Sequence, residues 1–173
     1  MDKKQTNNMR NIRIEKMTIN IGAGEAGPKL EKSQKLIETL FEHKAVKTKT
    51  KKRIPSWGVR PGLTIGVKTT LRGKNADKYL KRLLKAVGNK LKESNFDNNG
   101  NVNFSIKEYI DIPDAKYMPD VGIIGFNVCI TLERPGYRVK KRARKKSRIG
   151  RNHLITKKEA IDFMKKEYGV EIL

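Results

Sequence analysis

The amino-acid sequence predicts an α+β fold of two layers, a single domain over residues 1–173 in which a mainly antiparallel β-sheet carries helices packed on one face. Three observations lead to this prediction. A chain of 173 residues has the length of one domain and is long enough to bury a core. Segments with the two-residue alternation of strands and segments with helical periodicity follow one another in mixed order, with connections suited to hairpin neighbours. Two long segments without acidic residues interrupt this pattern and predict a protruding basic loop and a basic C-terminal extension.

The first quarter of the chain combines a strand and a helix. Residues 1–9 are polar and predict a flexible tail. Residues 12–21 alternate as a strand does, but the alternation slips, and a β-bulge near Glu15–Lys16 would reconcile the two registers. A glycine-rich turn over 22–27 follows, and a stripe of apolar residues then predicts a helix over 29–42.

The middle of the chain predicts two strands, a loop between them and a second helix. Residues 44–50 are typical of a short basic strand, whereas 51–62 hold two prolines and two glycines and predict a loop. Residues 63–72 show the clearest strand alternation in the chain. Leucines at helical spacing then predict a helix over 76–92, preceded by an asparagine suited to capping it.

The C-terminal half predicts two more strands, over 102–107 and 121–132, separated by an irregular acidic stretch over 108–120. A basic extended segment follows over 134–155, and we expect it to lack fixed structure away from a polyanion. The terminal helix, over 156–173, opens with a Thr-Lys-Lys-Glu capping-box pattern.

The face of the sheet turned away from the helices is expected to be rich in hydrogen-bond donors and short polar groups. Such a face suits contacts with 2′-hydroxyl and phosphate groups of RNA, and the alternative is an ordinary solvated sheet face. Its predicted members are Asn20, Lys68, Thr70, Arg72, Asn103, Lys107, Asn127 and Thr131.

The charge of the chain points to a polyanionic partner. Lysine and arginine number 40 against 18 acidic residues, which gives a net charge of +22. Residues 43–76 hold ten cations and residues 134–158 hold twelve, with no acid in either segment, so the rest of the chain is neutral. Nucleic acid is the commonest intracellular polyanion, and an alternative within this class is a DNA-packaging or chromatin protein.

The basic loop over 51–62 contains the only tryptophan, Trp57. This side chain either folds back into the core or stacks on a base or ribose while neighbouring cations neutralise phosphates. Further along, residues 138–151 carry charge with no aromatic side chain, which predicts phosphate binding without sequence readout; a nuclear-localisation signal is a weaker interpretation.

The turn over 22–27 matches the glycine pattern of a dinucleotide-binding site, which keeps a cofactor-dependent enzyme as the rival class. The segment that should supply an acid for the ribose is wholly basic, so we favour a simple turn or a backbone approach to RNA phosphate. The acids Glu108, Asp111, Asp114 and Asp120 lack metal-loop spacing, and neither histidine has a Ser or Cys partner. A lone Cys129 excludes an internal disulfide, no apolar run is long enough to span a membrane, and we expect no metal, no cofactor and no catalysis.

Five blocks of sequence, in order, resemble the L5 family of large-subunit ribosomal proteins, whose eukaryotic members are called L11. These blocks are IRIEKMTINIGAGEAG, TKTKKRIPSWGVRPGLTIGVKTTLRG, SNFDNNGN, IKEYIDIPDAKYMPDVGIIGFNVCITLERPGYRVKKR and HLITKKEAIDFM. The likeness runs from about residue 9 to the end of the chain, and the long basic segment is similar to the archaeal and eukaryotic type.

This resemblance implies a structural, cytoplasmic, ribosome-bound protein that supports subunit assembly and translation. Its implied partners are 5S rRNA, large-subunit rRNA, P-site tRNA and neighbouring ribosomal proteins of the central protuberance. Many relatives have Gln and Pro where this chain has His43 and Ala45. The candidate rRNA-binding residues are Asn20, Gly22, Gly24, His43, Lys44, Thr48, Lys68, Thr70, Arg72, Arg138, Lys140, Lys141, Arg142 and Arg144. The candidate tRNA-contacting residues are Lys51, Lys52, Arg53, Pro55, Ser56, Trp57, Gly58 and Arg60.

Overall fold

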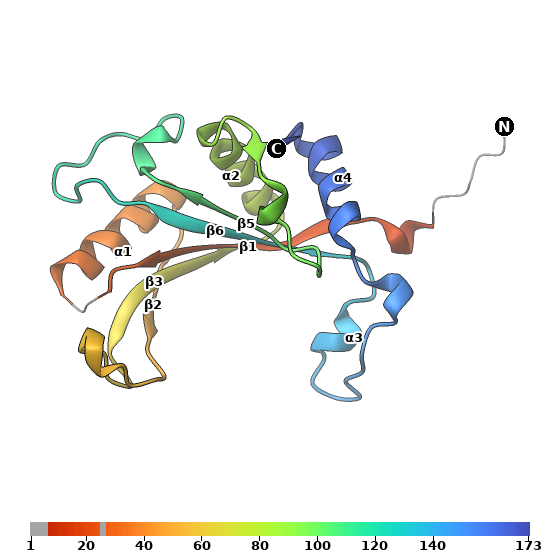
Figure 1. Cartoon of the computed structure of the whole chain (residues 1–173), viewed down its shortest axis with the longest axis horizontal. Helices are drawn as coiled ribbons and strands as arrows, with labels where there is room; N and C mark the ends of the chain where they lie inside the picture. Colours follow the sequence, from red (N-terminus) through yellow and green to blue (C-terminus); the bar gives the residue numbers. More distant parts are fainter. Residues whose placement is uncertain (1–6, 25–26) are drawn as a thin grey trace.

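A computed structural model describes residues 7–24 and 27–173, and its centre is a five-stranded sheet in which every neighbouring pair is antiparallel. Residues 1–6 of the predicted tail, and Glu25 and Ala26 of the glycine-rich turn, lie outside the described residues. The strands run in the spatial order β2-β3-β1-β6-β5 (Figure 1). Their bounds are β1 Arg13–Gly22, β2 Val46–Lys49, β3 Thr64–Leu71, β5 Val102–Ile106 and β6 Phe126–Glu133.

Three helices cover one face of this sheet and leave the other face open (Figure 1). They are α1 (Pro28–Phe41), α2 (Gly73–Ala86) and α4 (Lys157–Tyr168). The apolar stripes of the helices and the inward side chains of the strands form one buried cluster, in which Ile19, Leu36, Leu80 and Ile130 are fully enclosed. The predicted two-layer α+β architecture is therefore confirmed, with the core between the helices and the sheet.

The central strand β1 contains the predicted bulge. Its pairing with β6 shifts between Ile14 and Lys16, so that both halves of the strand turn apolar residues toward the helices. The terminal helix is also built as the sequence indicates. The Thr156 side chain accepts a hydrogen bond from the backbone N–H of Glu159, the Glu159 carboxylate accepts one from the backbone N–H of Thr156, and Gly169 ends the helix with a positive φ.

The boundaries of two helices and one strand differ most from the sequence prediction, and the terminal helix predicted over 156–173 ends at Tyr168. The helix predicted over 76–92 is α2, which begins at Gly73 and ends at Ala86, because Gly88 and Asn89 adopt positive φ and turn the chain. The residues beyond it form β4 (Lys90–Leu91), which pairs in parallel with β7 (Glu171–Ile172) after α4.

The strand predicted over 121–132 begins five residues later, at Phe126. The N–H groups of Val121 and Gly122 both donate to the Met118 carbonyl, and Gly122 has a φ of +74°, so these residues form a turn. At the other end of the chain, residues 8–10 of the predicted tail form a 3₁₀ turn whose first N–H groups are satisfied by Asn7.

Candidate nucleic-acid interface

The open face of the sheet carries two rows of mostly polar side chains. Directly opposed residues of antiparallel strands share a face, so the pairing register shows which side chains lie side by side. One row crosses all five strands and a parallel row crosses four of them, and neither contains an acidic residue. The first row is Val46, Lys68, Asn20, Asn127 and Ser105, and the second is Thr70, Thr18, Cys129 and Asn103.

This arrangement brings together most of the sheet residues selected from the sequence. Asn20 lies between Lys68 and Asn127, and Thr70 lies beside Thr18. Thr18 and Lys16 also belong to this face, and the sequence alone does not reveal them because the bulge obscures the alternation of β1. The signal that identifies them is the opposite strand, since Lys16 pairs with Thr131 in the register shared by the rest of the face.

At one end of the face the backbone itself is bare. Gly22 pairs with Gly66, and Gly66 pairs with Thr48 of the edge strand. A Cβ atom on Gly66 would lie 2.8 Å from the Thr48 hydroxyl and 2.9 Å from the Ile21 carbonyl oxygen, so no larger residue fits there. Gly24 then continues the chain with a φ of +81° and donates its N–H to the Ile65 carbonyl. Because β1 lies in an antiparallel sheet, this turn lacks the parallel βαβ setting that a dinucleotide site requires.

His43 and Lys44 lie at the edge of the sheet, and His43 points toward the helix side. The Nδ1 atom of His43 is 3.2 Å from the hydroxyl of Thr69, a side chain that is 2% exposed and shares the core face with Ile19. The structure therefore does not place the His43 ring on the open face with Asn20 and Thr70. Arg72 lies at the far end of β3, exposed, at the N-cap of α2.

The loop over 51–62 is a small hairpin that extends from β2 and β3. Ile54 and Val59 form an antiparallel bridge, and Pro55–Trp57 form a 3₁₀ turn at the tip. Trp57 is 76% exposed, whereas Val59 is only 4% exposed, so valine is the buried residue of this hairpin and the core interpretation of Trp57 is wrong. The other candidate tRNA-contacting residues of this loop are also exposed: Lys51, Lys52, Arg53, Pro55, Ser56, Gly58 and Arg60.

The second basic segment is not extended throughout. Near its start lies α3 (Arg138–Lys141), and one residue of this short helix fastens the segment to the sheet. The Lys141 ammonium lies 2.8 Å from a carboxylate oxygen of Glu15 and 2.8 Å from one of Glu133. Partial burial opposes the ionisation of Glu133, but hydrogen bonds and charge from Lys141 and Arg13 outweigh it and lower the pKa of Glu133. Lys141 is thus engaged within the protein, unlike the exposed side chains of Arg138, Lys140 and Arg144.

Arg134 is a further exception among the cations of this segment. Its side chain is 5% exposed, and its guanidinium donates to the carbonyls of His153 and Leu154 and to a carboxylate oxygen of Glu159 at 2.7 Å. It therefore anchors the segment to the start of α4 and adds no charge to the surface. Beyond α3 the guanidinium of Arg142 donates to the Lys145 carbonyl, which tightens the following turn.

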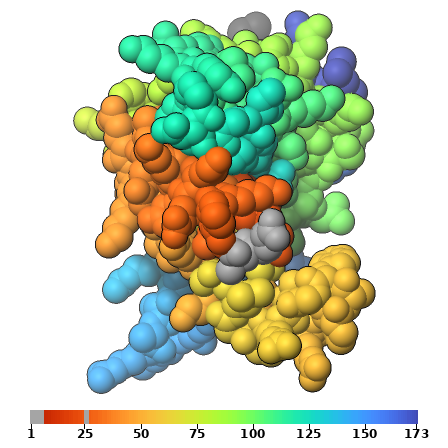
Figure 2. Space-filling model, turned by 90° about the vertical axis from the view of Figure 1, so that its left-hand side faces the viewer, coloured from red at the N-terminus to blue at the C-terminus, as the bar shows by residue number. Residues whose placement is uncertain are grey.

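The hairpin over 51–62 and the stretch around α3, which belong to the two acid-free segments, project from the same side of the molecule. In Figure 1 the hairpin between β2 and β3 and the segment around α3 extend downward from opposite ends of the sheet, on the side away from the helices. The end-on view of Figure 2 shows the same two projections, in yellow and blue, below the body of the protein. The polar face and its two basic flanks form one concave surface, which we call the open face.

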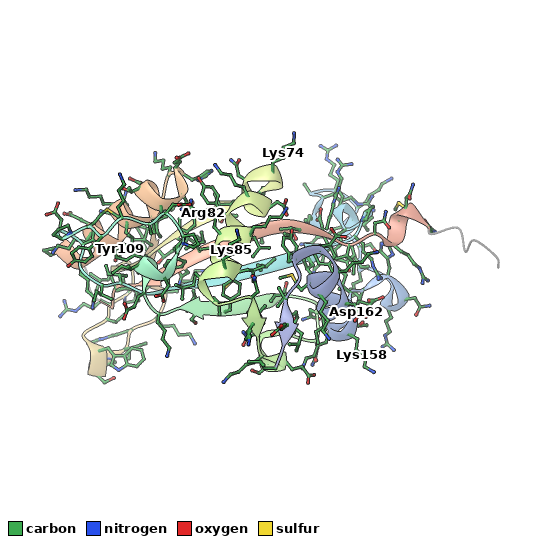
Figure 3. The ribbon with its side chains drawn as sticks, turned by 90° about the horizontal axis from the view of Figure 1, so that it is seen from above. Lys74, Arg82, Lys85, Tyr109, Lys158 and Asp162 are labelled. Carbon is green, nitrogen blue, oxygen red and sulfur yellow. The ribbon has the colours of Figure 1, made fainter. Side chains whose placement is uncertain are left out.

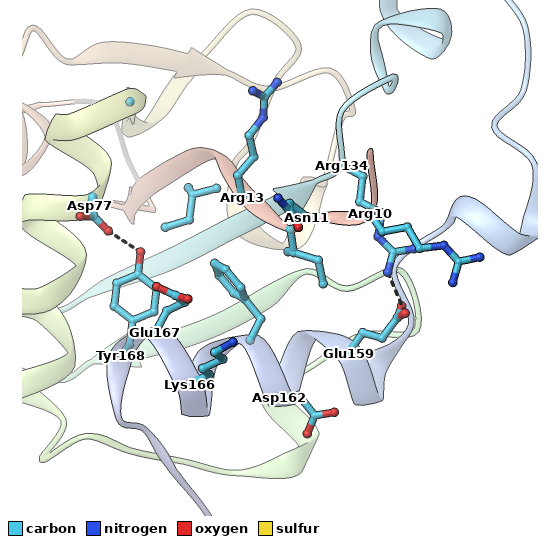
Figure 4. A pocket seen from close by; sticks show the side chains of 14 residues that line it. Arg10, Asn11, Arg13, Asp77, Arg134, Glu159, Asp162, Lys166, Glu167 and Tyr168 are labelled. Carbon is cyan, nitrogen blue, oxygen red and sulfur yellow. Dashed lines mark hydrogen bonds and ion pairs between the residues drawn. The ribbon is translucent and has the colours of Figure 1, made fainter. Parts of the chain in front are cut away.

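The helix side carries charges of both signs. Figure 3, seen from that side, shows Lys74 and Lys85 on α2 and shows Lys158 together with Asp162 on α4. A hollow of about 800 Å³ on this side lies between α4, α2 and the start of β1, and Asp77, Glu159, Asp162 and Glu167 all line it beside cations (Figure 4). Within it the Tyr168 hydroxyl donates to Asp77, and burial together with that carboxylate raises the pKa of Tyr168. The helix side therefore mixes charges of both signs, whereas the two projections of the open face carry cations without acids, as a polyanion prefers.

Residues 7–24 and 27–173 contain no group of three or more His, Cys, Asp or Glu side chains placed to hold a metal ion. In the same residues no helix is long and apolar enough to cross a membrane.

Comparison with known proteins gives matches over nearly the whole chain. The family model described as ribosomal protein L5 matches residues 7–60, and the model that describes the C-terminus of the same ribosomal family matches residues 64–166. A relative from Sulfolobus acidocaldarius, named large ribosomal subunit protein uL5, is 51% identical over 98% of this chain and 96% of its own length. Proteins of the same name from Nanoarchaeum equitans and Methanococcus vannielii are 52% and 46% identical, over 95% of this chain in each case and over 98% and 93% of their own lengths.

Proposed function

The chain belongs to the ribosomal L5 family, whose members are structural constituents of the large ribosomal subunit and not enzymes, and from this premise we propose that its open face binds 5S rRNA in the central protuberance. We propose further that the second basic segment contacts large-subunit rRNA, that the hairpin over 51–62 contacts P-site tRNA, and that neighbouring ribosomal proteins complete the site. The observation that carries the proposal is the open face, where two polar rows without an acid lie between two acid-free projections.

The chemistry of the open face suits a folded RNA. Lys68 and Lys16 supply cations for phosphates, while Asn20, Asn127 and Thr70 can donate to and accept from 2′-hydroxyl groups. The bare backbone at Gly22, where an added Cβ would meet nothing within 4 Å, permits close approach of a sugar-phosphate chain. A concave sheet with projections at both ends matches the convex backbone of an RNA helix, so shape and phosphate contacts together would give selectivity.

The experiment measures binding of the whole chain to a 5S rRNA transcript by filter retention at fixed moderate salt. The variants are Lys68→Ala, Thr70→Ala and Arg72→Ala, and the matched control is Lys85→Ala, an exposed lysine on the helix side (Figure 3). We expect each of the three to weaken binding by about three- to tenfold, because each removes a hydrogen bond to RNA worth ~0.5–1.5 kcal/mol. The control should bind as the parent chain does.

If all three variants bind 5S rRNA as tightly as the parent chain does, the open face does not bind this RNA. Circular dichroism confirms that every variant folds, and duplex DNA of matched length serves as competitor. A chain that bound duplex DNA as well as it binds 5S rRNA would support the DNA-packaging alternative instead.

A further inference from the structure

We propose that a hollow beside α3, outside the polar rows of the sheet, receives one unpaired nucleotide of ribosomal RNA, an inference that rests on the proposed function. The hollow measures about 560 Å³, within the range of roughly 300–1,000 Å³ typical of ligand pockets. Three stretches of chain meet there: the turn that holds Asn99, the helix α3 with the segment after it, and Leu154. The sequence predicts only non-specific phosphate binding by the basic segment, so a base-sized recess is an additional property.

The charge of the hollow fits a phosphate at its rim. Lys140, Lys146 and Arg148 line it, and no acidic side chain does. The hollow of Figure 4, by contrast, has four carboxylates in its lining, so its charge suits an anion less well than that of the recess beside α3. Lys140 and Lys141 are both exposed, but the ammonium of Lys141 is held by Glu15 and Glu133.

The floor of the hollow is apolar. Ile149 and Leu154 contribute it, and Leu154 is 41% exposed although the next residue, Ile155, is 2% exposed. Leu154 is kept outside the core by its backbone, because its carbonyl accepts from Arg134 and the following N–H donates to the Tyr137 hydroxyl. An apolar surface surrounded by cations suits the face of an unstacked base whose own phosphate lies at the rim.

The walls are held in place before any ligand arrives. The N–H of Ser147 donates to the Val139 carbonyl at 3.2 Å, which folds the segment back on α3. On the opposite wall, the N–H of Asn99 donates to the Asp97 carboxylate at 2.7 Å, and the same carboxylate oxygen accepts from the N–H of Asn101. The Asn99 amide and the Ser147 hydroxyl, carried on backbone that is held in this way, can donate to and accept from the edge of a base.

The first test compares Leu154→Ala with Ile123→Ala, a truncation of another exposed aliphatic side chain, outside the hollow. Each variant is titrated against two transcripts, 5S rRNA and large-subunit rRNA. We expect Leu154→Ala to weaken binding to one of them by roughly fivefold or more, since it removes the surface on which the base rests. The affected transcript identifies the source of the nucleotide. Ile123→Ala should bind both transcripts as the parent chain does, and unchanged unfolding temperatures show that both variants fold.

The second test irradiates assembled large subunits with ultraviolet light and analyses tryptic peptides by mass spectrometry. We expect a single-nucleotide adduct on the peptide spanning residues 152–157, which contains Leu154. Parent-like binding of Leu154→Ala to both transcripts, or adducts confined to other peptides, overturns the inference. The proposed function remains supported after those results if Lys68→Ala still weakens binding to 5S rRNA. If the parent chain binds neither transcript, both the proposed function and this inference are wrong.

Discussion

Two residues of the 51–62 hairpin show how exposure separates a structural role from a binding role. Trp57 is 76% exposed at the tip, and Val59 is 4% exposed two residues later. A large aromatic side chain left in water by a small, rigid hairpin has little to contribute to folding, because its apolar surface is not removed from solvent. Composition alone leaves both interpretations of Trp57 open, since it does not show that the bridge between Ile54 and Val59 turns valine inward.

We expect Trp57→Ala to change the free energy of unfolding by no more than ~0.5 kcal/mol, as is usual for surface substitutions, and Val59→Ala to cost about 1 kcal/mol or more. Chemical denaturation monitored by circular dichroism measures both. Binding of 5S rRNA should be the same in Trp57→Ala as in the parent chain, because the hairpin tip projects beyond the sheet. A marked loss of stability in Trp57→Ala would show that the side chain is packed after all.

At the scale of elements, features that depend on residues near one another in sequence could be predicted, whereas contacts between residues far apart in sequence could not. The bulge in β1, the capping box of α4 and the face carrying Asn20 and Lys68 follow from periodicity and local chemistry. The burial of Arg134 depends on Glu159, which lies 25 residues away, and no pattern within the basic segment reveals it. The strands β4 and β7 could not be predicted either, because a strand of two residues is too short to show an alternation of apolar and polar side chains.

The capping box of α4 gives a prediction for that helix. Thr156→Ala removes the acceptor of the Glu159 N–H and should cost about 1 kcal/mol of stability. Thermal unfolding measures the loss, and Thr156→Ser, which keeps the hydroxyl, is the matched control. Equal losses in the two variants would mean that the hydroxyl does not cap the helix.

The attachment of α3 to the sheet should depend on pH. The pKa of Glu133 is lowered in the folded chain, so its contribution to stability is present above its unfolded pKa and is lost as the pH falls through the lower folded value. The ion pairs with Lys141 are partly solvated and worth only ~1 kcal/mol or less in all.

We expect hydrogen exchange of the amides of residues 138–141, corrected for intrinsic rates, to accelerate below about pH 4.5. Glu133→Gln should show the faster exchange already at pH 7, and an exchange rate independent of pH in the parent chain would contradict this attachment.

At the scale of the whole molecule, the distribution of charge matters more than its sum. The net charge of +22 alone would attract any polyanion to any side of the protein. The fold concentrates unopposed cations at the two projections of the open face and interleaves acids among the cations of the helix side. Affinity for RNA should therefore depend on where a cation lies, even when the total charge is the same.

Two double variants with equal net charge test this dependence. Arg138→Ala/Arg144→Ala removes two exposed cations from the second basic segment, and Lys74→Ala/Lys85→Ala removes two from α2 (Figure 3). Each phosphate contact contributes a slope of about −0.7 to −0.9 to a plot of log K against log salt concentration. The first variant should reduce the steepness of that plot for large-subunit rRNA by about 1.4 to 1.8, because two contacts are lost. The second should leave the slope near that of the parent chain, since α2 lies on the opposite layer from the projections. Equal changes in the two slopes would show that RNA responds to the total charge alone, and the open face would then have no special part in binding.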